Sequence, residues 1–413
     1  MKCLVLIVNR CQPAYLGCYG NDWLVTSTLD RLAAESIVFD QHFAEEPAPR
    51  AARRNWRTGR YGYAPPAPHA DDLAQLLWRH QIKTALIADE RSPSFGGRFG
   101  LGWESQQWVR RERLAELEQE SLLGGTVQTA VEWLGQHGAR DRWLLWVELT
   151  ALQPPWEPAA FDAEALEGYE EAELEPWFDP PAGLVAAERA EQDTRRLEAT
   201  YAGTVSGVDQ WLGQLFDYLR EKGLYDDLLI VLTSDCGLPL GEHGTVFDHR
   251  PWLHEELVHV PLLIRMPGGA EAGRRVQQLT QGIDLLPTLA EAFGLPVPAG
   301  VHGRSLLPLV RGEPVKLREY ACSRARTAGH EEWSIRTHQW HLLLPVATAD
   351  DPPRSPQLYI KPEDRWEVND VLAQHPAAAE HLELTLRRFM AAARTDRLVE
   401  PPSLREDVLK LVQ

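Results

Sequence analysis

The sequence has few cysteines and no long apolar run. Its five cysteines are odd in number and scattered along 413 residues, with no pair at CxxC spacing: Cys3, Cys11, Cys18, Cys236 and Cys322. We therefore expect neither a disulfide framework nor a zinc site, and a reducing cytoplasm fits this pattern best. No stretch of about 18 apolar residues occurs, so no membrane span is expected. The apolar start at residues 3–8 is short for a secretory leader and favours a buried strand.

Basic residues are also in short supply. Lys and Arg total 42 against 60 Asp and Glu, which gives a formal net charge of −18. An acidic surface repels phosphate backbones, so nucleic acid is not an expected partner. The remaining composition, 44% hydrophobic and 25% charged, is that of a globular protein, and the length suffices for a large core plus an appendage.

Apolar, strand-like runs alternate with helical stretches over most of the chain. The runs that we assign to buried strands lie at residues 4–8, 84–88, 142–149, 228–233 and 260–265. This alternation predicts a parallel sheet with helices on both faces. Ligands bind such sheets at the carboxyl ends of the strands. The polar side chains expected near that crevice are Asn9, Arg10, Asp89, Gln153, Asp235 and Cys236.

The pattern changes near residue 317. Residues 333–336 and 340–344 are typical of antiparallel strands, and residues 376–392 of a closing helix. We therefore predict two domains: an α/β domain over residues 1–316 and a small α+β subdomain with an antiparallel sheet over residues 317–413.

Several short motifs follow one another in a recognisable order. They include Leu16-Gly17-Cys18-Tyr19-Gly20, Thr58-Gly59-Arg60-Tyr61, Ser234-Asp235-Cys236-Gly237, Leu240-Gly241-Glu242-His243-Gly244 and Gly303-Arg304-Ser305-Leu306. Each motif is weak by itself, but the ordered set, which spans nearly the whole chain, resembles the sulfatase family of the alkaline phosphatase superfamily. The resemblance implies an alkaline phosphatase-like α/β fold, with a mostly parallel sheet flanked by helices.

The positions of the family's metal ligands carry other residues here. In sulfatases a divalent metal, usually calcium, is held by carboxylates after the first strand and by ligands at a later strand end. The matching positions are Asn9, Arg10, Asp235 and Cys236. Hard cations need several oxygen ligands, an Arg side chain repels them, and a thiol is a soft ligand. We therefore predict no metal, and expect the Arg10 guanidinium to pair with Asp235 in its place.

The family's nucleophile is a Cys, oxidised to formylglycine, or a Ser, and its position falls on Pro49. The signature Arg that follows it falls on Arg53, or on Arg50 in an alternative register. No Ser, Thr or Cys occurs from residue 41 to residue 57. Nucleophilic catalysis needs an attacking oxygen or sulfur atom, so we predict no catalytic residue here.

The family's sulfate-binding cations are also replaced. Its Lys and His correspond to Asp89 and Arg91, and a second His corresponds to Gln153. Its last Lys falls on Arg250 or on Asp248, depending on the direction of counting. An anionic ester needs a positive field in its transition state, and Asp89 opposes that field.

Single residues also have plain structural explanations. Asp235 would be a structural partner of Arg10, and Cys236 a small buried hydrophobe. Arg50, Arg53, Arg54 and Arg57 have helical spacing and are interpreted either as a solvated or salt-bridged face or as an anion or partner site.

We predict a cytoplasmic, sulfatase-like pseudoenzyme without a metal or other cofactor. It would bind or scaffold a protein partner, a second copy of itself or an anionic ligand. The alternative is a hydrolase of sulfate or phosphate esters with a rebuilt site, in which Asp235, His243 or His249 is the general base. A third hypothesis is a purely structural subunit.

Overall fold

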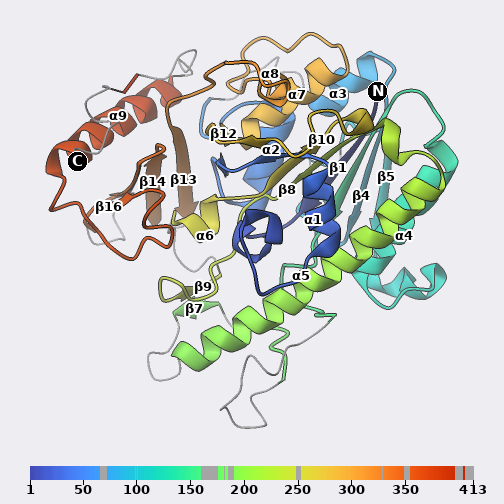
Figure 1. Cartoon of the computed structure of the whole chain (residues 1–413), viewed down its shortest axis with the longest axis horizontal. Helices are drawn as coiled ribbons and strands as arrows, with labels where there is room; N and C mark the ends of the chain where they lie inside the picture. Colours follow the sequence, from blue (N-terminus) through green and yellow to red (C-terminus); the bar gives the residue numbers. More distant parts are fainter. Residues whose placement is uncertain are drawn as a thin grey trace. The chain divides into compact units, whose positions relative to one another are not determined.

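The computed structural model describes residues 1–65, 72–97, 99, 101–159, 175–180, 182–184, 190–247, 253–327, 329–347, 354–395 and 403–404. The chain forms two compact units, each assembled from separate segments (Figure 1). The first unit comprises Met1–Asp40, Ala74–His249 and Val260–Val276, and the second comprises Gln41–Leu73, Arg250–His259 and Gln277–Gln413. No helix in these described ranges is both long and apolar enough to cross a bilayer.

The first unit is built on an eight-stranded sheet. Its strand order is β11-β2-β10-β8-β1-β6-β4-β5. The five strands from β8 to β5 are parallel, whereas β10 runs antiparallel to both of its neighbours. The bounds are β1 Lys2–Val8, β2 Ile37–Phe39, β4 Lys83–Asp89, β5 Ser105–Val109, β6 Trp143–Leu149, β8 Leu228–Thr233, β10 Leu262–Arg265 and β11 Arg275–Val276. The predicted mostly parallel sheet is confirmed.

The central strands are apolar along their whole length because both faces of the sheet are covered. Leu4, Leu6 and Val8 of β1 share a core cluster with side chains of the helices α1 (Ser27–Ala34), α4 (Leu122–His137) and α5 (Ala190–Glu221). The helix α3 (Leu73–Arg79), apart from Leu73, and the short paired strands β7 (Gly183–Leu184) and β9 (Thr245–Val246) also belong to the first unit.

A carboxylate from α5 holds the start of α1. Thr26 precedes α1 but makes no side-chain cap, and Asp209 instead accepts hydrogen bonds from the main-chain N–H of Thr28 (3.1 Å) and Leu29 (2.8 Å). Burial raises the pKa of Asp209, and these two bonds oppose that rise. A negative charge at a helix start satisfies orphan donors and the helix dipole, so this contact fixes α1 on α5.

The second unit contains a four-stranded antiparallel sheet in the order β13-β14-β15-β16. The helix α9 (Pro376–Arg394) contacts β14 and β15, and their apolar side chains form one cluster. The strand bounds are β13 Ala321–Thr327, β14 His330–Arg336, β15 Trp340–Val346 and β16 Gln357–Ile360. The predicted C-terminal antiparallel sheet and closing helix are therefore confirmed.

The second unit also takes in earlier parts of the chain. β3 (His42–Phe43) pairs with β12 (Thr280–Gln281), and α2 (Pro49–Thr58) contacts α7 (Leu285–Ala292). The helices α6 (Glu255–Val258) and α8 (Leu307–Val310) belong to it as well. This division into contact units differs from the domain boundary expected after residue 316. The expected boundary stays a prediction. Pairing between segments far apart in the chain leaves no local pattern in the sequence. The sequence patterns therefore did not predict that these earlier segments belong to the second unit.

Candidate functional site

The ends of β1 and β8 lie side by side in the sheet and carry four of the predicted site residues. The main-chain N–H of Asn9 bonds to the carbonyl of Leu149 (3.0 Å) and so extends the pairing of β1 with β6. Arg10 follows with a φ of 60°, and its main-chain N–H donates to Asp235 Oδ1 (2.9 Å). Asn9, Asp235 and Cys236 are buried. The structure thus brings these residues together, as the strand pattern predicted.

The Asp235 carboxylate accepts hydrogen bonds from the main chain around it. Oδ1 accepts from the N–H of Arg10 and from the N–H of Cys236, both at 2.9 Å, and lies 3.7 Å from Cys236 Sγ. The contact found between Arg10 and Asp235 runs through the Arg10 main chain. The predicted bond from the guanidinium therefore stays a prediction. The described contacts give Asp235 a structural task at the strand ends.

Tyr201 of α5 is a residue whose role at this site the sequence did not reveal. Its hydroxyl donates to the carbonyl oxygen of Arg10 (2.7 Å) and accepts from the main-chain N–H of Gln12 (3.0 Å). Burial raises the pKa of Tyr201 well above its usual value, so the hydroxyl keeps its proton and remains a donor. The sequence shows only a Tyr in the long helical stretch before β8. The local pattern around that Tyr does not indicate that its hydroxyl contacts the residues after β1.

A second corner forms where β4 ends. The buried Asp89 accepts from the main-chain N–H of Arg91 (2.8 Å) and from the hydroxyl of Thr150. Burial raises the pKa of Asp89, and the nearby Arg91 charge opposes that rise. The Arg91 guanidinium in turn donates to the carbonyl oxygens of Pro155 (3.0 Å) and Gln153 (3.4 Å). Arg91 thus ties the loop after β6 to the end of β4.

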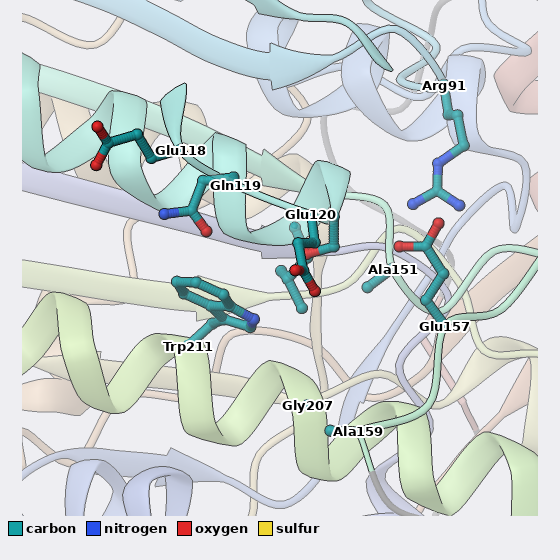
Figure 2. Close-up of a pocket in the computed structure, with 11 residues that line it drawn as sticks. Arg91, Glu118, Gln119, Glu120, Ala151, Glu157, Ala159, Gly207 and Trp211 are labelled. Carbon is teal, nitrogen blue, oxygen red and sulfur yellow. The ribbon is translucent and has the colours of Figure 1, made fainter. Parts of the chain in front are cut away.

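Two cavities of the first unit are lined by residues of the predicted site, and Arg10 and Gln153, both expected in one crevice, line the same cavity. Arg10 and Gln153 line a cavity of about 480 Å³, whose other lining residues are Pro154, Asp179, Pro180, Ala182, Leu238 and Phe247. Arg91 lines a different cavity of about 420 Å³. Figure 2 shows Arg91 and Glu157 at one end of it, and Trp211 with Gln119 and Glu118 at the other. Asp89 is among the lining residues of neither cavity.

In the second unit, α2 begins at Pro49, the position that the resemblance assigns to the nucleophile. Ala48 precedes it without a side-chain cap. The buried Arg53 donates to the carbonyl oxygen of Pro49 (2.8 Å), and its guanidinium carbon lies 5.5 Å from the centre of the Trp56 ring. The start of this helix is thus stabilised by an Arg that folds back on its own first turn.

The four arginines of α2 differ in exposure. Arg53 and Arg57 are buried, and Arg57 bonds to Asp72 (2.5 Å). Arg50 and Arg54 are exposed, and Arg54 pairs with Glu46 (2.7 Å). The ion pairs of Arg54 and Arg57 agree with the salt-bridged interpretation, and the anion or partner site stays a prediction. Asp248, His249 and Arg250 lie outside the described residues.

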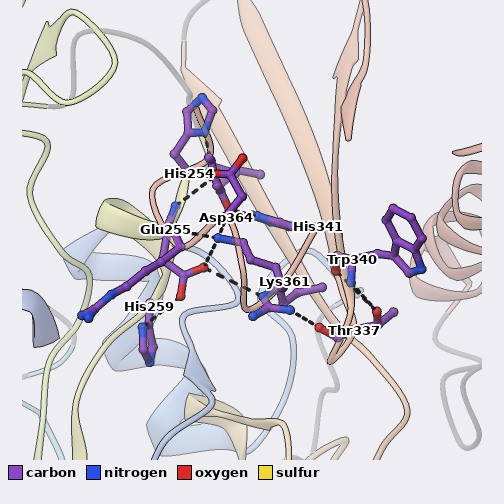
Figure 3. A network of polar contacts seen from close by, with 12 residues as sticks. His254, Glu255, His259, Thr337, Trp340, His341, Lys361 and Asp364 are labelled. Atoms are coloured by element: carbon purple, nitrogen blue, oxygen red, sulfur yellow. Dashed lines mark hydrogen bonds and ion pairs between the residues drawn. The ribbon is translucent and has the colours of Figure 1, made fainter. Parts of the chain in front are cut away.

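One group of side chains in the second unit has the composition of a metal site. Glu255, His341 and Glu367 bring their ligand atoms within 4.8 Å of one another. The Lys361 ammonium lies 3.0 Å from Glu255 Oε2 (Figure 3). It also lies 2.8 Å from Glu367 Oε1. His254 and His341 also contact the Glu367 carboxylate, at 2.7 and 2.6 Å. The Lys361 side chain thus contacts both carboxylates of this group.

The charges of this cluster follow from its contacts. Burial by itself would raise the pKa of both carboxyl groups, but the cations and histidines around them hold the pKa of Glu255 and Glu367 below the usual range. Burial also lowers the pKa of His341. The arrangement therefore favours charged carboxylates beside a neutral imidazole.

The fold and the strand-end site define a protein of the alkaline phosphatase-like class. The sequence model described as sulfatase matches residues 4–295, and the model described as N-sulphoglucosamine sulphohydrolase, C-terminal, matches residues 241–395. The first match covers well over half of the chain. The chain belongs to the sulfatase family.

Curated relatives match part of the chain. The N-acetylglucosamine-6-O-sulfatase of Bacteroides thetaiotaomicron is 32% identical over 192 residues, which cover 45% of this chain and 33% of the relative. The choline-sulfatase of Rhizobium meliloti is 32% identical over 223 residues, which cover 52% of this chain and 41% of the relative. The chain thus spans less than half the length of either relative.

Solved structures match almost the whole chain. A protein solved in complex with its substrate D-glucosamine-2-N,6-O-disulfate has a TM-score of 0.74 at 20% identity, and the match covers 97% of this chain and 98% of that one. The phosphonate monoester hydrolase of Agrobacterium radiobacter has a TM-score of 0.73 at 22% identity, covering 95% and 96%. At such identities the likeness concerns the fold, and it confirms the fold class expected from the sequence.

Proposed function

We propose that this member of the sulfatase family is a pseudoenzyme that binds a ligand or partner and does not hydrolyse sulfate esters. The observation that carries the proposal is Pro49 at the first turn of α2. A pyrrolidine ring has no atom that can attack sulfur, and no Ser, Thr or Cys occurs from residue 41 to residue 57. Proline suits the first turn of a helix, so α2 is retained without its nucleophile.

The strand-end residues support the same proposal because they do not fit calcium. They offer one carboxylate, one amide, one guanidinium and one thiol, from Asp235, Asn9, Arg10 and Cys236. Calcium takes six to eight oxygen ligands, mostly carboxylates and carbonyls. Asp235 Oδ1 also accepts two main-chain N–H groups, which would compete with a cation for its lone pairs. We derive no metal-dependent step here.

For the partner of such a protein we propose only the kind of molecule that it would be. The acidic chain, with a net charge of −18, disfavours nucleic acid and leaves a protein partner, a second copy of the chain or a small anion at a local cation. A cytoplasmic location is part of this proposal, on the scattered cysteines.

The test is turnover of 4-nitrophenyl sulfate, phosphate and phenylphosphonate esters, with and without calcium. We expect no release of 4-nitrophenol above the buffer blank, and the same result for Asp235→Asn. Pro49→Ser supplies a hydroxyl at the nucleophile position and should remain inactive, because the cations of the family's site are also replaced. Turnover by the unaltered chain that Asp235→Asn abolishes would overturn the proposal and favour the rebuilt hydrolase, with Asp235 as its base.

A further inference from the structure

The strand β5 ends the eight-stranded sheet and has one open edge. On its paired edge, the carbonyl oxygen of Val109 accepts a hydrogen bond from the main-chain N–H of Glu90, just after β4 (2.9 Å). Alternate residues of a strand turn their main chain to the same neighbour, so Gln107 faces β4 as Val109 does. The N–H and C=O groups of Gln106 and Trp108 therefore face the open edge. They make no hydrogen bond within the part of the chain that the structure describes.

The sequence of β5 lacks the features by which edge strands avoid pairing. Natural edges carry charged residues, proline or bulges that keep other strands away. The five residues of β5 read Ser-Gln-Gln-Trp-Val, without a charge, a proline or a glycine. The pairing with β4 is also unbroken from Ser105 to Val109. Such an edge is a template for the addition of another strand, through main-chain hydrogen bonds.

A cavity of about 460 Å³ lies beside this edge. Its lining residues come from β5, from the 3₁₀ helix η4 (Arg111–Leu117) and from α4. They are Gln106, Gln107, Trp108, Val109, Arg110, Arg113, Leu117, Thr129 and Glu132. Successive residues of a strand point to opposite faces of the sheet, so a hollow lined by a continuous run of β5 lies along its edge. The hollow offers space for side chains of an added strand.

From these features we propose that β5 pairs with β5 of a second copy of the chain, antiparallel about a two-fold axis at Gln107. Two-fold symmetry makes a strand edge its own complement. In this register Gln106 exchanges main-chain hydrogen bonds with Trp108 of the second copy, and Gln107 faces its counterpart in a non-hydrogen-bonded pair. The inference rests on the proposed function in one respect, because it selects the second copy among the partners named there.

The charges that flank β5 favour this register. Glu104 precedes the strand and Arg110 follows it. A two-fold axis at Gln107 brings each Glu104 opposite Arg110 of the other copy. An axis at Trp108 would instead bring Glu104 opposite Glu112, and an axis one residue before Gln107 would give neither charge an opposite partner. Opposite charges across an antiparallel pair stabilise it, and like charges destabilise it.

These charges select the register but contribute little affinity. Glu104 already lies 2.8 Å from the Lys83 ammonium, and Arg110 lies 3.4 Å from Glu112 in its own chain. Exposed ion pairs of this kind exchange partners at little cost. The affinity therefore comes from the main-chain hydrogen bonds of a short ladder. Such a ladder buries less than a standard interface, so we expect a dissociation constant on the order of 1–100 μM.

The first test is sedimentation velocity of the whole chain at concentrations from about 1 to 500 μM, a range that brackets a weak interface. We expect the sedimentation coefficient to rise from that of a monomer to that of a dimer. A chain that stays monomeric throughout would overturn the proposal.

A proline variant locates the surface. Gln106→Pro removes an N–H that faces away from β4, a position where edge strands tolerate proline, so the fold should persist. Loss of this donor in both copies should weaken association about tenfold or more. Gln106→Ala is the matched control, because it shortens the same side chain and keeps the N–H, and it should associate like the unaltered chain. Unchanged association of Gln106→Pro would place the dimer contact on another surface and refute the proposal.

Cysteine cross-linking tests the register. In a non-hydrogen-bonded antiparallel pair the Cα atoms lie about 4.5 Å apart, within the span of a disulfide. Gln107→Cys should therefore link two copies under mild oxidation, as seen on a non-reducing gel. Gln106→Cys faces Trp108 of the other copy and should link no more than the unaltered chain. Equal linking at both positions, or none at Gln107→Cys, would contradict the register.

A charge exchange provides a gain that misfolding cannot produce. Arg110→Glu sets like charges opposite each other at both ends of the ladder and should weaken association about tenfold. Glu104→Arg, added to that variant, should restore the affinity. A double variant that associates no better than Arg110→Glu would also contradict the register.

The two proposals fail in different ways, because association is measured without any ester. A monomeric chain without turnover would overturn the dimer and leave the pseudoenzyme. A dimeric chain that hydrolyses 4-nitrophenyl sulfate would overturn the proposed function and leave the pairing of β5.

Discussion

Carboxylates with little exposure are stabilised differently in the two units of this protein. In the first, Asp235 accepts hydrogen bonds from main-chain N–H groups at the ends of two strands. In the second, Glu255 and Glu367 share the ammonium of Lys361. Main-chain donors are neutral and belong to the fold itself, whereas an ammonium is one side chain that a single substitution removes. The comparison predicts that the second region is the more fragile of the two.

The largest effect is expected from Lys361→Ala. Removing the cation takes the ammonium from the buried Glu367 and the partly buried Glu255, which should lower the free energy of unfolding by about 3–5 kcal/mol. Urea unfolding at pH 7 measures the change. Lys316→Ala is the matched control, because that lysine pairs with Glu319 at the surface and should change stability by about 0–1 kcal/mol. A loss at Lys361 no larger than this would contradict the predicted fragility of the second region.

A smaller effect is expected in the first unit from Tyr201→Phe. The change leaves the Arg10 carbonyl and the Gln12 N–H without the hydroxyl that bonds to both, at a cost of about 1–3 kcal/mol. Tyr218→Phe, on the same helix but with a half-buried ring, is the control and should be close to neutral. If Tyr201→Phe proved as costly as Lys361→Ala, the contrast between the two regions would fail.

The pH dependence of stability should differ in sign between the regions. Glu367 has a depressed pKa, so its contribution is present above its ordinary value of 4.5 and is lost as the pH falls further. Asp89 has a raised pKa, so its contribution is complete below its ordinary value of 3.8 and is lost as the pH rises through the folded value. Glu367→Gln should therefore flatten the loss of stability in acid, measured by urea unfolding from pH 7 to pH 3.

Asp89→Asn tests the opposite sign. This variant should lose stability relative to the unaltered chain in acid, and the difference should shrink or reverse as the pH rises to 7. A difference that grows with pH would mean that the Arg91 contact, and not burial, dominates at Asp89.

The smallest effect is expected from metal removal. The strand-end residues do not fit calcium, and Lys361 occupies the acidic cluster. A chelator should therefore leave the melting temperature unchanged, and calcium should not raise it, since a ligand of the folded state stabilises only if it binds. A melting temperature that rises with calcium and falls in Asp235→Asn would contradict this expectation.

Much of the candidate site was predictable from the sequence, and part of it was not. Asn9 and Asp235 were expected at neighbouring strand ends, because apolar runs mark parallel strands and their carboxyl ends share one edge. The positions of the side chains could not be predicted from the sequence. Arg91 lines a different cavity from Arg10, and Arg53 is buried beside an exposed Arg54. Spacing along a strand or helix gives a face, but the packing of other segments decides which face is covered.

The sequence by itself determined the fold class, through short apolar runs that alternate with helical stretches, and it determined the absence of an attacking side chain around Pro49. These properties are local, since each depends on residue types within a few positions of one another. Only the tertiary structure decided that Lys361 contacts both Glu255 and Glu367, and that Tyr201 bonds to the main chain of Arg10. Those contacts join residues far apart in the chain, and burial, which sets their strength, exists only once the chain has folded.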